Sequence, residues 1–85
     1  MKVRFTRRFE RDYSRLPDDI KVRAEKQLTL LLTDPRHPSL NVKKMSGYEG
    51  IWEGRITRSC RFTFQIIEDT YILRRIGTHD VLSNP

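Results

Sequence analysis

Three short segments of alternating apolar and polar residues make up most of the C-terminal half of this chain. They span residues 51–57, 61–67 and 71–76, and links of three residues join them. Side chains alternate between the two faces of a β-strand, and links this short suit antiparallel hairpins. The pattern therefore predicts a curved antiparallel sheet with one apolar face and one polar face, and it leaves little freedom for another architecture.

The apolar face of this sheet should be buried. The residues that we expect to point into the core are Trp52, Ile56, Phe62, Phe64 and Ile66. The residues between them include Arg55 and Arg61, which should share the open face. In the last segment Arg74 and Arg75 are adjacent, so alternation does not say which of them faces outward.

The N-terminal half has the pattern of one strand followed by two helices. Residues 2–5 alternate, and Thr6 is a suitable N-cap for a helix over residues 7–15. Pro17 suits the first position of a second helix, which Asp34-Pro35 should end. The buried stripe of that helix should be Ile20, Ala24, Leu28, Leu31 and Leu32.

Two shorter segments complete the order of elements. Residues 42–45 have the pattern of a short strand, and residues 78–84 that of a turn or helical tail. The predicted fold class is α+β, with the order β-α-α-β-β-β and one further short strand as an option. Residues 1–85 should form one small domain in which two N-terminal helices pack on a single face of the sheet.

The charge of the chain favours a polyanionic partner. Its 17 Lys and Arg exceed its 11 Asp and Glu, for a net charge of +6. A nucleic acid or an acidic protein would suit this balance, and the alternative is a solvated basic surface without a specific partner. A chain of 85 residues has little room for an enclosed pocket, so an active site should be an open surface.

Several classes of function lack their sequence features. Cys60 is the only cysteine, which excludes an internal disulfide, and with His37 and His79 it does not form the spaced ligand pairs of zinc sites. There is no glycine-rich phosphate loop and no dinucleotide fingerprint. Without a signal peptide or a long apolar run, we expect a soluble cytoplasmic protein that uses no membrane, metal or cofactor.

Arginine and histidine are the candidates for chemistry. Arg55 and Arg61 can hold a phosphate group and stabilise charge that develops on it. His79 follows the last strand, and imidazole titrates near neutrality, so it suits the proton transfers of RNA cleavage. The alternatives are a solvated arginine pair and a histidine that only hydrogen-bonds the backbone. Asp80 is the only acid that we expect near this face.

Lys43 and Lys44 precede the hairpins. Adjacent residues of a strand point to opposite faces, so at most one of the two lysines should join the arginines. A lysine there could bind phosphate as a point charge or assist proton transfer. The alternative is a lysine that only keeps the surface soluble.

Four short motifs follow one another in a characteristic order. They are Asp34-Pro35-Arg36-His37-Pro38-Ser39-Leu40, Trp52-x-x-Arg55-Ile56, Arg61-Phe62-x-Phe64-Gln65 and Gly77-Thr78-His79-Asp80. With the helices before them, they resemble the RelE/ParE superfamily of type II toxins over essentially the whole chain. The resemblance implies a toxin neutralised by a cognate antitoxin. In the RelE-like branch it also implies a nuclease that enters the ribosomal A site and cuts mRNA.

The resemblance also suggests roles for single residues. Arg55 matches an arginine that contacts the scissile phosphate, and His79 matches a C-terminal catalytic histidine. Arg61 matches a frequent basic position at the start of the next strand. Val81 and Leu82 stand where a tyrosine could follow the histidine, so the match departs from the pattern there.

We therefore expect a metal-independent, ribosome-dependent mRNA endoribonuclease with an antitoxin, the ribosome and mRNA as partners. The residues expected to be catalytic are Arg55, His79 and Lys44. Those expected to bind RNA are Lys43, Arg58, Arg61, Arg74 and Arg75. Since the ParE branch poisons gyrase without cutting RNA, a gyrase inhibitor is the first alternative. A non-enzymatic or degenerate binding module is the second, and the oligomeric state is not predicted.

Overall fold

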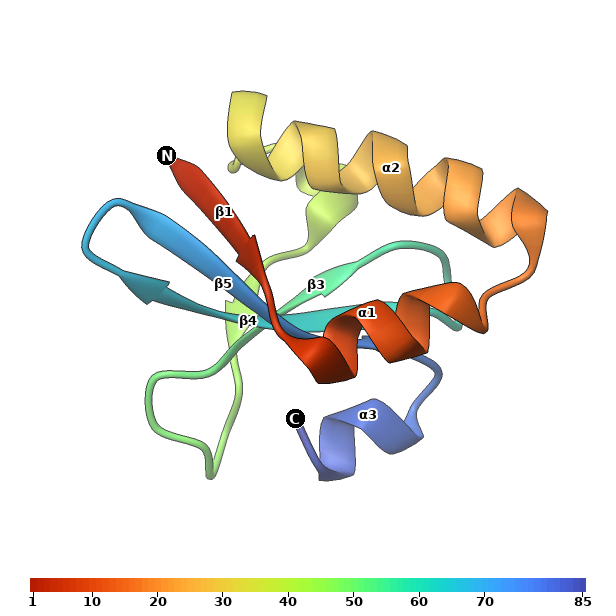
Figure 1. The fold of residues 1–85 in the computed structure, drawn as a ribbon. Coiled ribbons are helices and arrows are strands. Elements are labelled where there is room, and N and C mark those ends of the chain that lie inside the picture. Colours follow the sequence, from red (N-terminus) through yellow and green to blue (C-terminus); the bar gives the residue numbers. More distant parts are fainter.

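The chain folds into a five-stranded sheet with α2 above it and a short third helix below (Figure 1). The structure is a computed structural model that describes residues 1–85. Its elements are β1 (Lys2–Phe5), α1 (Arg7–Ser14), α2 (Asp18–Thr33), a 3-10 turn (Pro38–Leu40), β2 (Lys43–Lys44), β3 (Trp52–Arg55), β4 (Arg61–Ile67), β5 (Thr70–Gly77) and α3 (Asp80–Ser83). The predicted elements are confirmed, with ends that differ by one or two residues. No helix is both long and apolar enough to cross a bilayer.

The sheet is mixed, and this differs from the predicted all-antiparallel sheet. The strand order is β1-β5-β4-β3-β2. The neighbouring strands from β2 through β5 pair antiparallel, whereas β1 pairs parallel to β5, with Val3 opposite Tyr71. Short links impose antiparallel pairing on β3, β4 and β5. Two helices separate β1 from the other strands, and a connection of that length permits a parallel neighbour.

The predicted register of the central strands is confirmed. Phe62 is fully buried, Phe64 is 1% exposed, and Trp52 is half-buried with its ring 6.4 Å from that of Phe64. Ile66 is 45% exposed, so the prediction that it joins the core was wrong. It lies near the tip of the β4–β5 hairpin.

Gly54 makes room for the central aromatic of the core. Phe62 is its direct cross-strand partner, and a Cβ built on Gly54 would collide with the Phe62 ring. The glycine is required by space and not by an unusual backbone angle, since only Gly47, Gly50 and Gly77 have positive φ among the glycines. A side chain at this position would push Phe62 out of its place.

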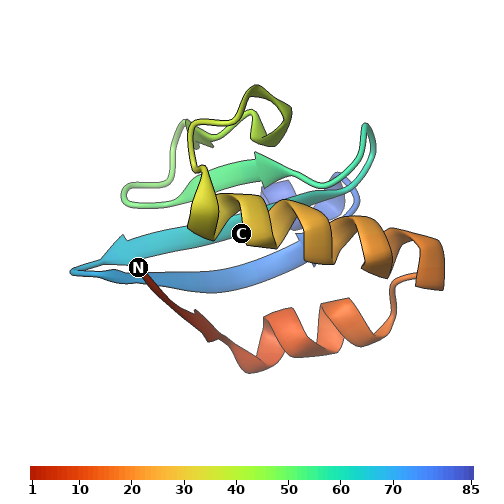
Figure 2. The same ribbon diagram turned by 90° about the horizontal axis from the view of Figure 1, so that it is seen from above.

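The two N-terminal helices begin where the sequence indicates. Thr6 caps α1, because its hydroxyl oxygen accepts a hydrogen bond of 3.1 Å from the Phe9 amide. Pro17 lies one residue before α2 and not within it. Figure 2 shows α2 crossing the sheet, with α1 alongside it on the β5 side.

The buried stripe of α2 differs from the prediction at two positions. Ala24 and Leu31 are buried as expected, but Leu32 is 41% exposed. Gln27 is buried instead, with 7% of its surface exposed. It is three residues after Ala24 and four before Leu31, so it belongs to the core-facing side of the helix.

Candidate functional site

The face of the sheet opposite α2 carries most of the polar side chains that the sequence singled out. Lys43 pairs with Glu53, Glu53 with Thr63, and Thr63 with Arg75, while Arg55 pairs with Arg61. Directly opposite residues share a face, so these side chains form one surface. We call it the α3 face, after the helix that covers part of it. Its members are Lys43, Glu53, Arg55, Arg61, Thr63, Gln65 and Arg75.

Arg55 and Arg61 lie side by side on this face, as their alternation predicted. Both are half-buried. The Nε of Arg55 is buried without a hydrogen-bond partner, whereas Nη1 of Arg61 donates to the Thr57 carbonyl at 2.7 Å. Two arginines that are direct cross-strand partners on one face favour an anionic ligand at this place.

The backbone of Arg55 is held from the other side of the sheet by Gln27. Nε2 of Gln27 donates to the Arg55 carbonyl at 3.0 Å and to the Ser39 carbonyl at 3.2 Å. One bond ends on the last residue of β3 and the other on the 3-10 turn, so together they fix the end of that strand. Sequence reasoning missed Gln27, although its position within the apolar stripe of α2 was a usable signal.

The two lysines of β2 point to opposite faces. Nζ of Lys43 lies 3.5 Å from Oε1 of Glu53, on the α3 face. The ammonium of Lys44 lies over the Trp52 ring, 5.4 Å from its centroid. The structure therefore does not bring Lys44, which was expected among the catalytic residues, to the side of Arg55; Lys43 is there instead.

Glu53 is an acid of the α3 face that the sequence analysis overlooked. It is 9% exposed and pairs with Thr63, whose buried hydroxyl has no hydrogen-bond partner. The expectation that Asp80 is the only acid near this face was therefore wrong. The same alternation that turns Arg55 to this face also turns the residue two positions before it.

A β-bulge resolves the ambiguity between Arg74 and Arg75. The β4–β5 register shifts next to Thr63, so both arginine side chains reach the C-terminal residues of the chain. Nε of Arg74 donates to the Pro85 carbonyl at 3.1 Å, and Nη1 of Arg75 donates to the Asn84 carbonyl at 3.2 Å. A bulge lets two consecutive residues point to one side of a sheet.

Both of these arginines are engaged within the molecule. Arg75 forms a two-point ion pair with Asp12 of α1, with Nε 2.6 Å from Oδ2 and Nη2 3.2 Å from Oδ1. These hydrogen bonds raise the pKa of Arg75, against the opposing effect of burial. Arg74 donates to the Gln65 side chain at 2.8 Å. An RNA-anchoring role for the pair stays a prediction.

The C-terminal segment from Thr78 to Pro85 crosses the α3 face and carries His79. Val81 is buried, and its Cγ1 lies 3.0 Å from where a Cβ on Gly77 would stand. The Tyr48 hydroxyl donates to the Ser83 carbonyl at 3.0 Å. His79 itself is exposed at the N-cap position of α3, and its side chain makes no capping bond. The imidazole is therefore open to a ligand at the margin of this face.

The first turn of α3 is held by a short hydrogen bond beside His79. The Thr78 hydroxyl donates to Oδ1 of Asp80 at 2.7 Å. This bond, together with a backbone amide, lowers the pKa of the Asp80 carboxyl. The carboxylate therefore stays ionised and keeps the turn in place around the histidine.

The turn between β3 and β4 displays Arg58. The Thr57 hydroxyl accepts hydrogen bonds from the amides of Ser59 and Cys60, which makes the turn rigid, and Arg58 is exposed at its tip. Cys60 belongs to the core, and burial raises the pKa of its thiol. No three His, Cys, Asp or Glu side chains gather in a way that would hold a metal ion.

Solved structures identify the architecture. No family model and no curated protein matches the sequence. The toxin of the Methanococcus jannaschii RelB-RelE complex superposes with a TM-score of 0.75 at 21% identity, over 94% of each chain. A chain of the Escherichia coli DinJ-YafQ complex gives 0.79 at 16% identity, over 95% of this chain and 94% of that one. The chain has the fold of the RelE and YafQ toxins.

A third toxin of known structure has the same fold. The YoeB/ParE toxin of Agrobacterium tumefaciens superposes with a TM-score of 0.78 at 19% identity, over 93% of this chain and 99% of that chain. The RelE-like fold expected from the sequence motifs is thereby confirmed. Identities this low establish the architecture, and the chemistry has to be argued from the side chains of this chain.

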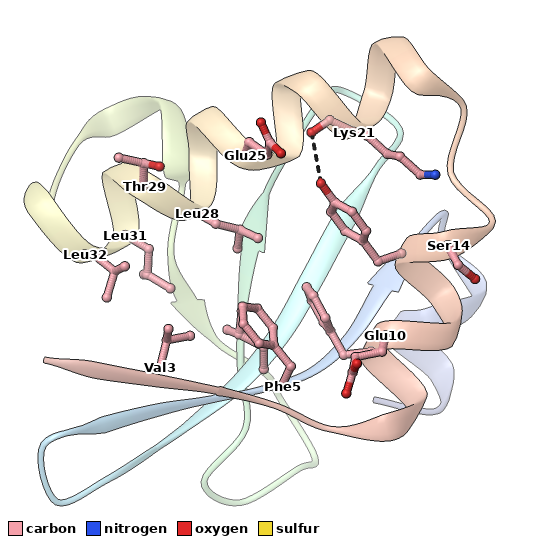
Figure 3. Close-up of a pocket in the computed structure, with 13 residues that line it drawn as sticks. Val3, Phe5, Glu10, Ser14, Lys21, Glu25, Leu28, Thr29, Leu31 and Leu32 are labelled. Carbon is pink, nitrogen blue, oxygen red and sulfur yellow. Dashed lines mark hydrogen bonds between the residues drawn. The ribbon is translucent and has the colours of Figure 1, made fainter.

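The helical side of this RelE-like fold has an apolar groove. It lies between α1, α2 and β1 and has a volume of about 750 Å³ (Figure 3). Its lining includes the exposed residues Phe5 and Leu32, and Tyr13, whose hydroxyl donates to the Lys21 carbonyl at 3.4 Å. Burial, and next the charge of Glu25, raise the pKa of the Tyr13 phenol. This groove and the α3 face are separate surfaces.

Proposed function

We propose that this protein is the toxin of a type II toxin–antitoxin system and acts as a ribosome-dependent mRNA endoribonuclease. The observation that carries the proposal is the placement of Arg55 and Arg61 side by side on the α3 face, with exposed His79 on the helix that covers it. Guanidinium groups can stabilise the charge that develops on phosphate, and an exposed imidazole can transfer the protons of RNA cleavage without a metal. The RelE-like fold supports the same proposal.

In this mechanism the arginines bind the scissile phosphate. The 2′-oxygen of the ribose attacks phosphorus, the bond to the 5′-oxygen breaks, and a 2′,3′-cyclic phosphate forms. Negative charge grows on the non-bridging oxygens during attack, and the guanidinium group of half-buried Arg55 would stabilise it. Arg61 and Arg58 would hold the neighbouring RNA backbone.

Proton transfer falls to His79. Cleavage takes one proton from the 2′-hydroxyl and gives one to the leaving 5′-oxygen, and an imidazole can serve at either step. Lys43 assists with its charge, since the ion pair with Glu53 directs its ammonium along the α3 face. Lys43 replaces Lys44 in the mechanism because Lys44 lies over Trp52.

The proposed partner for the apolar groove is a segment of the cognate antitoxin. Two of the similar structures are toxin–antitoxin complexes, RelB-RelE and DinJ-YafQ. The groove has an apolar floor and charged residues at its margin, among them Glu10, Lys21 and Glu25. An amphipathic segment would bury its apolar side there and leave its charges in water.

The test is primer extension on mRNA from cells that express the protein without an antitoxin. We expect new 5′ ends within translated regions for the wild-type chain, and none for Arg55→Ala or His79→Ala. Arg58→Ala is the matched control, because it removes an exposed arginine from the neighbouring turn and should weaken cleavage only in part. Circular dichroism should show that each variant has the same fold as the wild type.

The same experiment separates the alternatives. Intact mRNA together with stalled gyrase would support a gyrase inhibitor, and the resemblance of the fold to a toxin named YoeB/ParE makes that outcome worth measuring. Intact mRNA and normal gyrase activity, from a folded protein, would leave only a binding function.

A further inference from the structure

Four arginines on α1 form a second basic surface, away from the α3 face. They are Arg7, Arg8, Arg11 and the C-cap residue Arg15, and we call them the α1 arginine stripe. All four are exposed, and none of their side chains takes part in an ion pair or hydrogen bond within the protein. Four positive charges on a short helix thus remain without a partner.

Helix geometry gathers these charges on one side. Successive residues of an α-helix are about 100° apart, so the four arginines fall within an arc of roughly 100°. Phe9 and Tyr13, which face the core and the groove, lie on the opposite side of the helix. Arg7, Arg11 and Arg15 are each four residues apart and extend over roughly 12 Å at about 1.5 Å per residue.

The acidic residues of α1 do not neutralise the stripe. Asp12 is turned toward the sheet and forms its ion pair with Arg75 at 2.6 Å. Glu10 lines the apolar groove. The exposed residues of α2 outside the groove differ, because they mix both signs: Asp18, Asp19, Arg23 and Lys26. The single-sign surface is therefore a feature of α1 and not of the chain's helices in general.

We infer that the α1 arginine stripe docks on the phosphate backbone of double-helical RNA. Arginine matches phosphate with paired donors, and a row of such charges binds a polynucleotide backbone without reading its sequence. The arc contains no aromatic side chain, which disfavours single-stranded RNA, since that is bound largely by base stacking. It also contains no apolar anchor of the kind on which protein interfaces depend, which disfavours an acidic peptide.

The choice of RNA over DNA rests on the proposed function, in which the protein works on the ribosome. Docking itself does not require the nuclease, because the stripe and the α3 face use different residues. Binding and cleavage can therefore fail independently, and the two ideas are tested by separate measurements.

The experiment measures binding of the full chain to a short labelled RNA hairpin as salt is raised. The variant Arg7→Gln/Arg11→Gln/Arg15→Gln should bind at least tenfold more weakly. Its plot of log affinity against log salt should be less steep, by up to about 0.9 for each phosphate that the variant no longer neutralises. The corresponding triple lysine variant should retain most of the affinity, because the charge is kept.

The matched control is Arg23→Gln/Lys26→Gln, which removes two exposed positive charges from α2. It should leave the salt slope close to that of the wild type. Equal losses per charge in the α1 and α2 variants would overturn the inference, because net charge alone would then explain binding. If the triple glutamine variant lost more affinity for a DNA duplex, for single-stranded RNA or for polyglutamate than for the hairpin, that result would overturn the inference as well.

Discussion

At the scale of single residues, the fold depends on the fit between Phe62 and Gly54. Phe62 is fully buried, and the absence of a side chain on Gly54 leaves room for its ring. Alternation alone indicated that Phe62 is a core residue. The requirement for glycine opposite it was not visible, because it depends on which residues the two strands bring face to face.

We expect Phe62→Ala to lower the free energy of unfolding by about 3–5 kcal/mol, since it leaves a cavity in the core. Gly54→Ala should cost about 1–3 kcal/mol through overpacking against the ring. Combining Gly54→Ala with Phe62→Leu should cost less than the sum of these two single changes, because the smaller side chain makes room for the new methyl group. Urea unfolding of the wild type, Gly54→Ala, Phe62→Leu and the double variant gives the coupling free energy. Strict additivity would contradict the contact.

The positions of the polar residues could be predicted from the sequence only in part. Alternation correctly put Arg55 and Arg61 on one face, but it could not choose between Lys43 and Lys44. That choice depends on the register of β2 against β3, which places Lys43 opposite Glu53. The positions of Arg74 and Arg75 depend on a bulge, and nothing in the hydrophobic pattern marks one.

At the scale of elements, α3 is the part of the fold that shapes the candidate site. It is short and is held by buried Val81, by the Tyr48–Ser83 bond and by the Thr78–Asp80 bond at its start. The sequence predicted a turn or helical tail here. It did not predict that the tail returns across the sheet, because the bonds that hold it there involve backbone carbonyls of the last residues.

The start of α3 should depend on pH in the acidic range. The Thr78 hydroxyl lowers the pKa of Asp80 below its ordinary value of 3.8, so the carboxylate stabilises the folded turn at every pH above that value. This contribution should be lost as the pH falls through the lower folded pKa.

The measurement is the carboxyl carbon shift of Asp80 in an NMR pH titration. Thr78→Ala should move the titration of Asp80 back toward its ordinary value, and Thr78→Ser should largely preserve the wild-type behaviour. A wild-type midpoint at or above the ordinary value would show that the bond contributes nothing to the turn.

At the scale of the whole molecule, three surfaces divide the proposed work. The α3 face would cut RNA, the groove between α1, α2 and β1 would receive the antitoxin, and the α1 arginine stripe would dock on helical RNA. The order of the elements and the packing of α2 on the apolar face of the sheet were predictable from periodicity and link lengths. The parallel pairing of β1 was not, because a long connection allows either direction.

Antitoxin binding should combine apolar burial with attraction to a protein of net charge +6. We expect the affinity for the purified antitoxin to fall as salt rises, since ions screen the charged contacts. Leu32→Asp, on the exposed wall of the groove, should weaken binding at every salt concentration, whereas Val22→Asp on the outer surface of α2 should not. Isothermal titration calorimetry measures the affinity of each variant for the antitoxin. Equal effects of the two changes would argue against the groove as the binding site.

The most direct test of the central claim is single-turnover cleavage of mRNA on purified ribosomes. The wild-type chain should cut the message. Arg55→Ala should lower the rate by about 10²–10³, as loss of a transition-state donor does. His79→Ala should lower it as well and change the pH–rate profile. If folded His79→Ala and Arg55→Ala proteins cleave at the wild-type rate, the α3 face is not the active site.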